Sequence, residues 1–402
     1  MSFNIKRGWI VRFAAASLLL LAMASPSVAA VRHEQHVARE GNGWMQENTG
    51  PLGGEKSLQV LHFIGNVQVI TGASSASYVL RLHSAEADER DARREFSTFH
   101  LGIGHARGVD VMQPVGPVDL ALRAELILQI PAKTEDVHVD SMGGTISIRG
   151  KVHRLDVQVH GGDIEIDEAD QLRAVTVGGS VIVNHRLGDS FIRTEGGDIR
   201  VDASVGDLEI ASLGGNIWLK AIANGRVQSG GGNIEVVRCA GALVIRTAGG
   251  NINLGEMGGQ VTAETGGGGI RIGVARGMVA VSTALGDIEL WKLSQGAIAH
   301  SGMGSITAEF VGGPGAMRNS ELVTSMGNIV VYFAAGVPAN VHALTGASPS
   351  RRIISDFADV RSTNGLPQYG PRSIFAEGAI HGGGPDLFLR TMIGQIELRN
   401  AH

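Results

Sequence analysis

GGTISI (residues 143–148), GGDIEI (161–166) and GGSVIV (178–183) repeat one phrase, in which two glycines precede a small polar residue and alternating aliphatic residues. Shorter forms of the phrase continue to residue 306. The last glycine of each copy lies at residue 144, 162, 179, 197, 215, 232, 250, 269, 286 and 304, so the steps are 17 to 19 residues. A fixed period of this kind is typical of a solenoid, in which each repeat buries its apolar face against its neighbours.

Between the glycine pairs, apolar residues alternate with polar ones, as they do from Leu155 to Val159. Alternation indicates strands with one buried face. We therefore predict an all-β fold, a parallel β-solenoid with rungs of about 18 residues stacked ~4.8 Å apart. Each rung is expected to hold a strand, a Gly-Gly turn with positive φ, a second strand and a second turn. One inward column is predicted to contain Ile164, Ile199, Ile217, Ile234 and Ile252.

The chain is expected to divide into five segments. These are a signal peptide (1–30), a flexible mature N-terminus (31–54), an N-terminal β region with a short helix (55–135), the regular solenoid (136–310), and irregular C-terminal rungs and loops (311–402). The helix is expected within 84–96, with Ser84 as N-cap and Glu89 and Arg93 one turn apart. The terminal rungs are expected to be atypical because they must cap an open sheet edge.

The N-terminus predicts export. Lys6, Arg7 and Arg12 form a basic region, an apolar stretch follows over 13–24, and small residues at 28–30 form a cleavage site, with 22–24 as an alternative. The mature chain would then lie in the periplasm, on the cell surface or outside the cell. A membrane partner is expected only if the signal segment stays uncleaved.

The net charge bears on the kind of partner, and the cysteine count bears on how the fold is stabilised. The net charge is -5 and the basic residues are scattered, which argues against nucleic acid as a partner. The single cysteine, Cys239, excludes an internal disulfide, so the fold must depend on packing and backbone hydrogen bonds.

In the Gly-Gly repeats described above and in three further stretches, the chain resembles the bacterial putative adhesin family, a domain-of-unknown-function family of exported β-solenoid proteins. The features that carry the resemblance are LQIP (128–131) before the first repeat, the Gly-Gly-Asp/Asn-Ile phrase, DF (356–357), and GQIEL (394–398) near the end. The resemblance covers about residues 55 to 400. It implies an exported solenoid and supplies no catalytic residue.

The polar residue after each glycine pair forms a column along one edge of the predicted stack. Its members are Thr145, Asp163, Ser180, Asp198, Asn216, Asn233, Asn251, Gly269, Asp287 and Ser305. Turn chemistry explains such residues, and a cation or glycan edge is the alternative. Calcium-binding β-rolls also contain Gly-Gly turns, but here a buried aliphatic residue follows the polar one, so the ligand set is missing. We predict no metal site and no cofactor.

Enzymes that cut acidic polysaccharides also use solenoids, and they need two carboxylates at a fixed separation. Asp163 and Glu165 are the strongest candidate pair, because both face outward on one strand. Arg271 and Glu289 are expected to form a surface ion pair. No residue set suggests substrate positioning, so we predict no catalytic residues and no enzymatic activity, with a polysaccharide lyase or hydrolase as the alternative.

Histidines and tryptophans offer weaker candidates. His138 and His160 are expected to be solvated at the surface. Trp218 and Trp291 occupy outward strand positions, where tryptophan can serve as a sugar platform; a covering loop is the favoured expectation. We therefore predict an exported, non-enzymatic binding or structural scaffold of the cell envelope or surface, whose partner is an envelope polysaccharide or protein.

Overall fold

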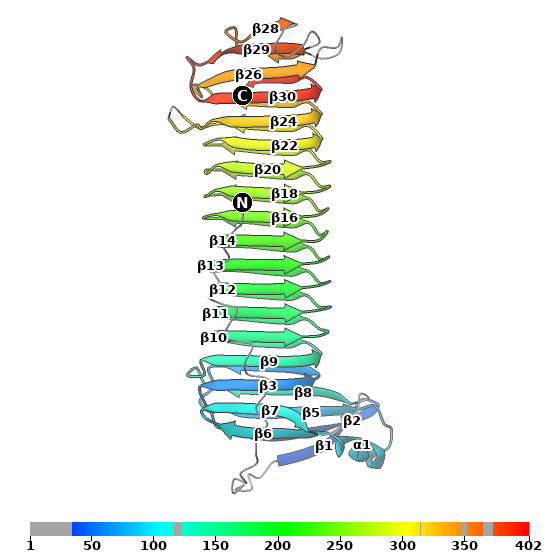
Figure 1. Ribbon diagram of the computed structural model, residues 1–402. Coiled ribbons are helices and arrows are strands. Elements are labelled where there is room, and N and C mark those ends of the chain that lie inside the picture. The colour runs from blue at the N-terminus through cyan, green and yellow to red at the C-terminus, as the bar shows by residue number, and fades with distance from the viewer. Residues whose placement is uncertain (1–33, 116–121, 314, 347–351, 365–372, 402) are drawn as a thin grey trace. The chain divides into compact units, whose positions relative to one another are not determined.

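The computed structural model describes residues 34–115, 122–313, 315–346, 352–364 and 373–401. The predicted signal peptide lies outside these ranges. The described strands belong to one continuous hydrogen-bonded sheet, which winds into a stack of rungs (Figure 1). Within the array, each strand pairs in parallel with the equivalent strand one period later. The predicted all-β parallel solenoid is confirmed.

The first half of the array is built from single long strands. In these rungs the chain bends at a local register shift instead of making the predicted second turn. From residue 240 onward a turn separates two short strands in each rung. The long strands are β10 (Ile146–Val159), β11 (Ile164–Thr176), β12 (Val181–Thr194), β13 (Ile199–Ser212) and β14 (Ile217–Ser229). The short strands are β15 (Ile234–Cys239), β16 (Leu243–Thr247), β17 (Ile252–Met257), β18 (Val261–Thr265), β19 (Ile270–Ala275), β20 (Val279–Thr283), β21 (Ile288–Leu293), β22 (Ala297–Met303) and β23 (Ile306–Phe310).

The predicted inward column is confirmed. Ile217 pairs with Ile234, and Ile234 pairs with Ile252, in unbroken parallel register. These isoleucines, with Ile164 and Ile199, are at most 1% exposed. Every rung of this column carries a β-branched side chain, with Val181 between Ile164 and Ile199, so side chains of similar shape pack against each other from rung to rung.

Close approach of the rungs, more than backbone conformation, requires the second glycine of each pair. A Cβ at Gly232 would lie 2.0 Å from the carbonyl oxygen of Gly215. Positive φ, which the sequence analysis expects at every turn, occurs at Gly144 (φ 93°) but not at Gly232. The spacing also places Gly268, not Gly269, in the glycine column, because a Cβ at Gly268 would meet the Gly250 oxygen at 2.2 Å.

A buried hydroxyl column, not foreseen from the sequence, fastens these turns. The Thr194 hydroxyl donates to the carbonyl of Gly179 (2.8 Å) and accepts from the N–H of Gly197 (3.1 Å). The same donor bond to a glycine of the preceding rung in the stack recurs at Thr176, Thr247, Thr265, Thr283, Ser301, Thr324, Thr345 and Thr391. One hydroxyl thus satisfies two backbone groups that the tight turn leaves unpaired.

The N-terminal region begins with an antiparallel hairpin, so the expectation of a flexible segment over 31–54 is wrong for 34–51. Strand β1 pairs with β2, and β2 pairs with β5, which satisfies the backbone of the segment. The elements are β1 (Glu34–Glu40), β2 (Gly43–Pro51), β3 (Ser57–Ile64), β4 (Asn66–Thr71), β5 (Ser77–Ser84), α1 (Glu89–Phe96), β6 (His100–Ala106), β7 (Val109–Val115), β8 (Arg123–Ile130) and β9 (Asp136–Gly143).

Helix α1 is shorter than expected. Its N-cap is Asp88, whose carboxylate accepts from the N–H of Arg90 at 2.8 Å, so the assignment of Ser84 as N-cap is wrong. A carboxylate at this position also faces the positive end of the helix dipole. The predicted pair of Glu89 and Arg93 forms, at 2.7 Å.

The C-terminal rungs do not follow chain order. Strand β30 pairs with both β24 and β26, and β31 pairs with both β25 and β27, so the last rung is inserted beneath residues that precede it (Figure 1). The strands are β24 (Ser320–Met326), β25 (Ile329–Phe333), β26 (Ala339–Gly346), β27 (Ile353–Ser355), β28 (Arg361–Asn364), β29 (Ser373–Ile380), β30 (Asp386–Ile393) and β31 (Ile396–Asn400).

Candidate functional site

The polar column along the Gly-Gly edge is part of the hydrogen-bonded scaffold. The Asp163 carboxylate accepts from the N–H of Ser180 at 2.8 Å, and the Asn233 side chain accepts from the N–H of Asn251 at 2.9 Å. The same bond to the next rung is made by Asn66, Asp198, Asn216, Asn251, Asp287, Ser305 and Asn328. These side-chain oxygens are therefore used to bind rung to rung, which explains the column by turn chemistry.

The candidate carboxylate pair is similarly occupied. Glu165 lies 2.9 Å from the Arg149 guanidinium and accepts from the side-chain amide of Asn184 at 3.2 Å. Asp163 bonds to the next turn, as above. Both carboxylates therefore take part in the contacts that hold the stack together.

Ion pairs cover the outward face of the first rungs. Lys151 contacts Asp170 at 2.8 Å, and this bond holds the pKa of the Asp170 carboxyl below its usual range. Farther along the array, Arg271 and Glu289 form the predicted pair at 2.8 Å. Each pair joins successive rungs, so the charges are arranged to attract along the stack.

The two histidines differ. His160 is exposed, as predicted, whereas His138 is half-buried and lies 3.4 Å from the Asp156 carboxylate. Burial pushes the pKa of Asp156 upward, but hydrogen bonding to His138 and the charge of Arg173 lower it overall. The prediction of a solvated His138 is therefore wrong, because its partner sits at the matched position on the next strand.

Side chains of other rungs, not a loop, contact Trp218 and Trp291. The Arg200 guanidinium lies over the Trp218 ring, 4.4 Å from its centroid. Trp291 stacks on Tyr332 at 6.1 Å. One ring face of each tryptophan is therefore used for a contact within the array.

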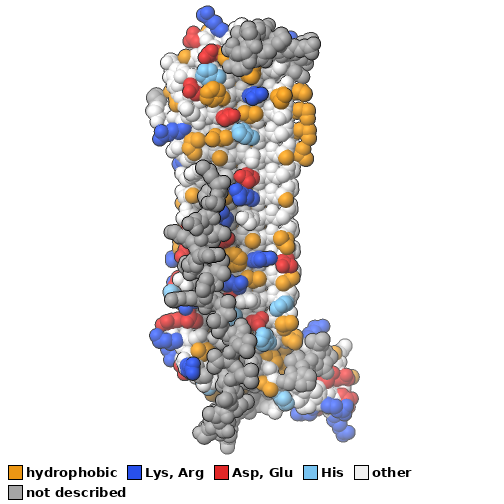
Figure 2. Space-filling view, in the orientation of Figure 1, with side chains coloured by type: hydrophobic (Ala, Val, Ile, Leu, Met, Phe, Trp, Pro, Cys, Tyr) orange, Lys and Arg blue, Asp and Glu red, His pale blue; other side chains and the backbone are white. Residues whose placement is uncertain are grey.

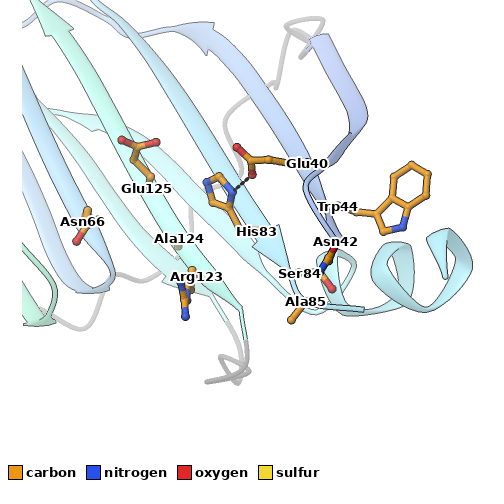
Figure 3. A pocket seen from close by; sticks show the side chains of 11 residues that line it. Glu40, Asn42, Trp44, Asn66, His83, Ser84, Ala85, Arg123, Ala124 and Glu125 are labelled. Carbon is orange, nitrogen blue, oxygen red and sulfur yellow. Dashed lines mark hydrogen bonds and ion pairs between the residues drawn. The ribbon is translucent and has the colours of Figure 1, made fainter. Parts of the chain in front are cut away.

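A concave site lies in the N-terminal region, between the β1–β2 hairpin and strands β4, β5 and β8 (Figure 3). It is an open pocket of about 600 Å³. Glu40 and His83 point toward each other across it at 2.6 Å. Arg123, Glu125 and Asn66 complete its polar lining, while the indole of Trp44 lies beside α1.

Strand pairing fixes the positions of these side chains. His83 on β5 is directly opposite Arg123 on β8. Two residues away on β5, Arg81 lies between Glu47 on β2, at 2.9 Å, and Glu125 on β8, at 3.5 Å. The hydrogen bond that Arg81 donates to Glu47 raises the pKa of Arg81, so the guanidinium stays charged and holds Glu125 in place.

This pocket offers charged donors and acceptors around an open cavity, the arrangement that recognises a polar, hydroxyl-rich or charged ligand. Sequence reasoning missed it because the pocket requires the hairpin over 34–51, which has no repeat. A smaller pocket of about 280 Å³ lies near the other end, where His342 is within 3.3 Å of Glu377 and 3.6 Å of Asp386.

Among the described residues, no group of three or more His, Cys, Asp or Glu side chains is placed to hold a metal ion. No helix within the described ranges has the length and apolar character needed to cross a membrane. Cys239 is buried, and burial raises the pKa of its thiol, which keeps it protonated.

Comparison with known proteins gives a family and several structural likenesses. The family model Toastrack DUF4097 matches residues 112–321, just over half of the chain. A search of the curated proteins found no match.

Three solved structures described as putative adhesins are similar to the chain. They come from Parabacteroides merdae (12% identity, 71% of this chain and 95% of that chain, TM-score 0.31), Parabacteroides distasonis (9%, 73% and 98%, 0.28) and Bacteroides fragilis (10%, 72% and 96%, 0.23). Likenesses at this level say nothing about ligand or activity.

Proposed function

The chain belongs to the Toastrack DUF4097 family, and we propose that it is an exported, non-enzymatic scaffold that binds an envelope polysaccharide or protein at the cell surface or in the periplasm. One observation carries the proposal: most outward carboxylates of the array, the candidate pair Asp163 and Glu165 included, already bond to a neighbouring rung. Asp163 holds the next turn and Glu165 holds Arg149. A rigid array of this kind positions binding residues at its ends.

The binding site in this proposal is the pocket of Figure 3. Glu40, His83, Arg123 and Glu125 come from three strands whose register is fixed by backbone pairing. A preformed polar pocket loses little conformational entropy on binding, which suits a hydroxyl-rich ligand. Removal of residues 1–30 during export also belongs to the proposal, and mass spectrometry of the chain recovered from the cell envelope tests it.

Binding can be tested with immobilised envelope polysaccharides and whole-envelope extracts. We expect the purified chain to bind, and Arg123→Ala to weaken binding by about tenfold or more, since it removes a charged hydrogen-bond donor. Arg226→Ala, on an exposed strand position of the array, is the matched control and should bind normally. Binding that Arg123→Ala leaves intact would remove the pocket from the proposal.

A second candidate, a polysaccharide lyase or hydrolase, has one observation in its favour. The same pocket brings Glu40, His83 and Glu125 together, and paired carboxylates with a histidine are the groups that general acid-base chemistry uses. Scoring cleavage products in the binding screen separates the two candidates: product formation abolished by Glu40→Gln would favour the enzyme.

A further inference from the structure

One position of the Gly-Gly turn changes character along the edge of the array. The residue before the turn glycine is itself glycine at residues 143, 161, 178, 196, 214, 231, 249 and 267. In the next four rungs of the stack the same position holds Leu285, Met303, Met326 and Ile393. With the adjacent Met392, these four form the apolar ridge. Gly231, Gly249 and Gly267, on the three rungs just before it, form the glycine track.

The apolar ridge is exposed. Its five side chains are between 42% and 59% exposed, and they stack on successive rungs. Figure 2 shows hydrophobic side chains gathered along one edge of the upper rungs, with a mostly white edge just below them. Contiguous exposed apolar patches mark interaction surfaces, and this ridge runs over four successive rungs.

Nothing within the chain requires the glycines of the track. A Cβ built on Gly231 or Gly249 meets no atom within 4 Å, and one on Gly267 meets only ordinary contacts at 3.8 Å. None of the three has a left-handed φ. Leu285 shows that the same position accepts a large side chain. Because these turns carry no side chains, their edge is flat, and a surface with projecting side chains can approach the backbone closely here.

We propose that two copies of the chain associate antiparallel and edge to edge, so that the apolar ridge of each lies on the glycine track of the other. The two-fold axis passes between the rungs of Gly268 and Gly286. Met303 then faces Gly249 of the second copy, and Met326 faces Gly231. Ile393 meets the rung of Leu213, another exposed apolar side chain. Both edges share one rung spacing, so the fit holds along the whole contact.

The area supports a second copy over a foreign partner. A stable interface buries about 800 Å² per partner, which favours an arrangement that buries more than one ridge. In the antiparallel dimer each copy contributes its ridge and its track, so two ridges are buried in one continuous contact.

Charges near the axis are also complementary. Arg271 and Glu289 pair within the chain at 2.8 Å, on the rungs either side of the axis. The two-fold symmetry places Arg271 opposite Glu289 of the second copy, which gives alternating signs. The turns of the track, residues 230–233, 248–251 and 266–269, hold no charged residue, so the ridge side chains meet no charged side chain in those turns.

Sedimentation velocity of the full chain tests the oligomeric state. We expect a dimer at micromolar concentration. Met326→Asp and Gly231→Leu should each raise the dimer Kd on the order of 30-fold, the effect of losing one interface anchor. Gly161→Leu is the matched control, because that glycine is equally open but lies outside the contact. Circular dichroism confirms that each variant folds.

Cysteine pairs test the register. Gly231→Cys combined with Met326→Cys should give an intermolecular disulfide, whereas Gly231→Cys combined with Leu285→Cys should not. A chain that stays monomeric, or a dimer unaffected by Gly231→Leu, would overturn the proposal. So would a monomer that floats with phosphatidylglycerol vesicles and loses this on Met326→Asp, since the ridge would then serve a lipid surface.

Discussion

The array and the two ends are both built from β-strands, but the strands pair in chain order only in the array. From β10 to β23 every rung contacts the rung one period before it and the rung one period after it, so the neighbours of any residue can be counted from the sequence. At the ends this fails. Strand β3 lies between β7 and β9, and β30 lies between β24 and β26. The period of the array thus determines the contacts that stabilise it, whereas the two pockets described above lie at the ends.

The largest effect is expected inside the array. Ile234→Asp places an unpaired carboxylate in a fully buried column and should lower the free energy of unfolding by about 4 kcal/mol or more, or prevent folding. Urea unfolding followed by circular dichroism measures this. The neighbouring exposed substitution Glu235→Ala is the control, and equal stability of the two variants would contradict the register.

The glycine pair offers a matched comparison away from the proposed dimer contact. A Cβ at Gly179 would lie 1.9 Å from the Gly162 oxygen, whereas one at Gly178 meets nothing within 4 Å. Gly179→Ala should therefore cost about 3 kcal/mol, because backbone must move, and Gly178→Ala less than about 0.5 kcal/mol. Thermal melts of both variants decide this. Similar melting temperatures would show that rung spacing does not dictate the second glycine.

The hydroxyl column compares the array with the C-terminal end. Thr194→Val removes a donor and an acceptor from two turn groups and should cost about 2 kcal/mol. Thr391→Val removes one bond, to the Gly327 oxygen, and should cost about 1 kcal/mol. Chemical denaturation measures both. A larger loss at Thr391 would mean that the inserted rung limits the stability of the whole stack.

The smallest expected effect concerns metal. The aspartate and asparagine oxygens of the polar column already accept backbone N–H groups. We therefore expect melting curves in EDTA and in millimolar calcium to coincide. A calcium-dependent rise in melting temperature would show that these oxygens also bind an ion.

The sequence could predict whatever repeats. The period located the isoleucine column, the Gly-Gly turns and the polar edge, because in a solenoid sequence distance and spatial distance are linked. It also predicted the Arg271–Glu289 pair, since both residues occupy one position on successive rungs.

What the sequence could not predict depends on contacts without a period. The hairpin of β1 and β2 joins β5, and the pocket it forms brings Glu40 next to His83 across 43 residues. The hydroxyl column was visible in principle, because Thr or Ser recurs three residues before every turn glycine except Gly162, where the residue is Val159. Its meaning required the turn geometry, in which the hydroxyl reaches two backbone groups at once.

The central claim is that the outward carboxylates of the array serve the stack and not chemistry. Incubation of the purified mature chain with acidic and neutral polysaccharides tests it most directly, with new reducing ends and unsaturated products both measured. We predict no turnover, and unchanged folding on Glu165→Gln apart from a loss of about 1 kcal/mol from the Arg149 pair. Turnover that Glu165→Gln abolishes, with folding intact, would contradict the account.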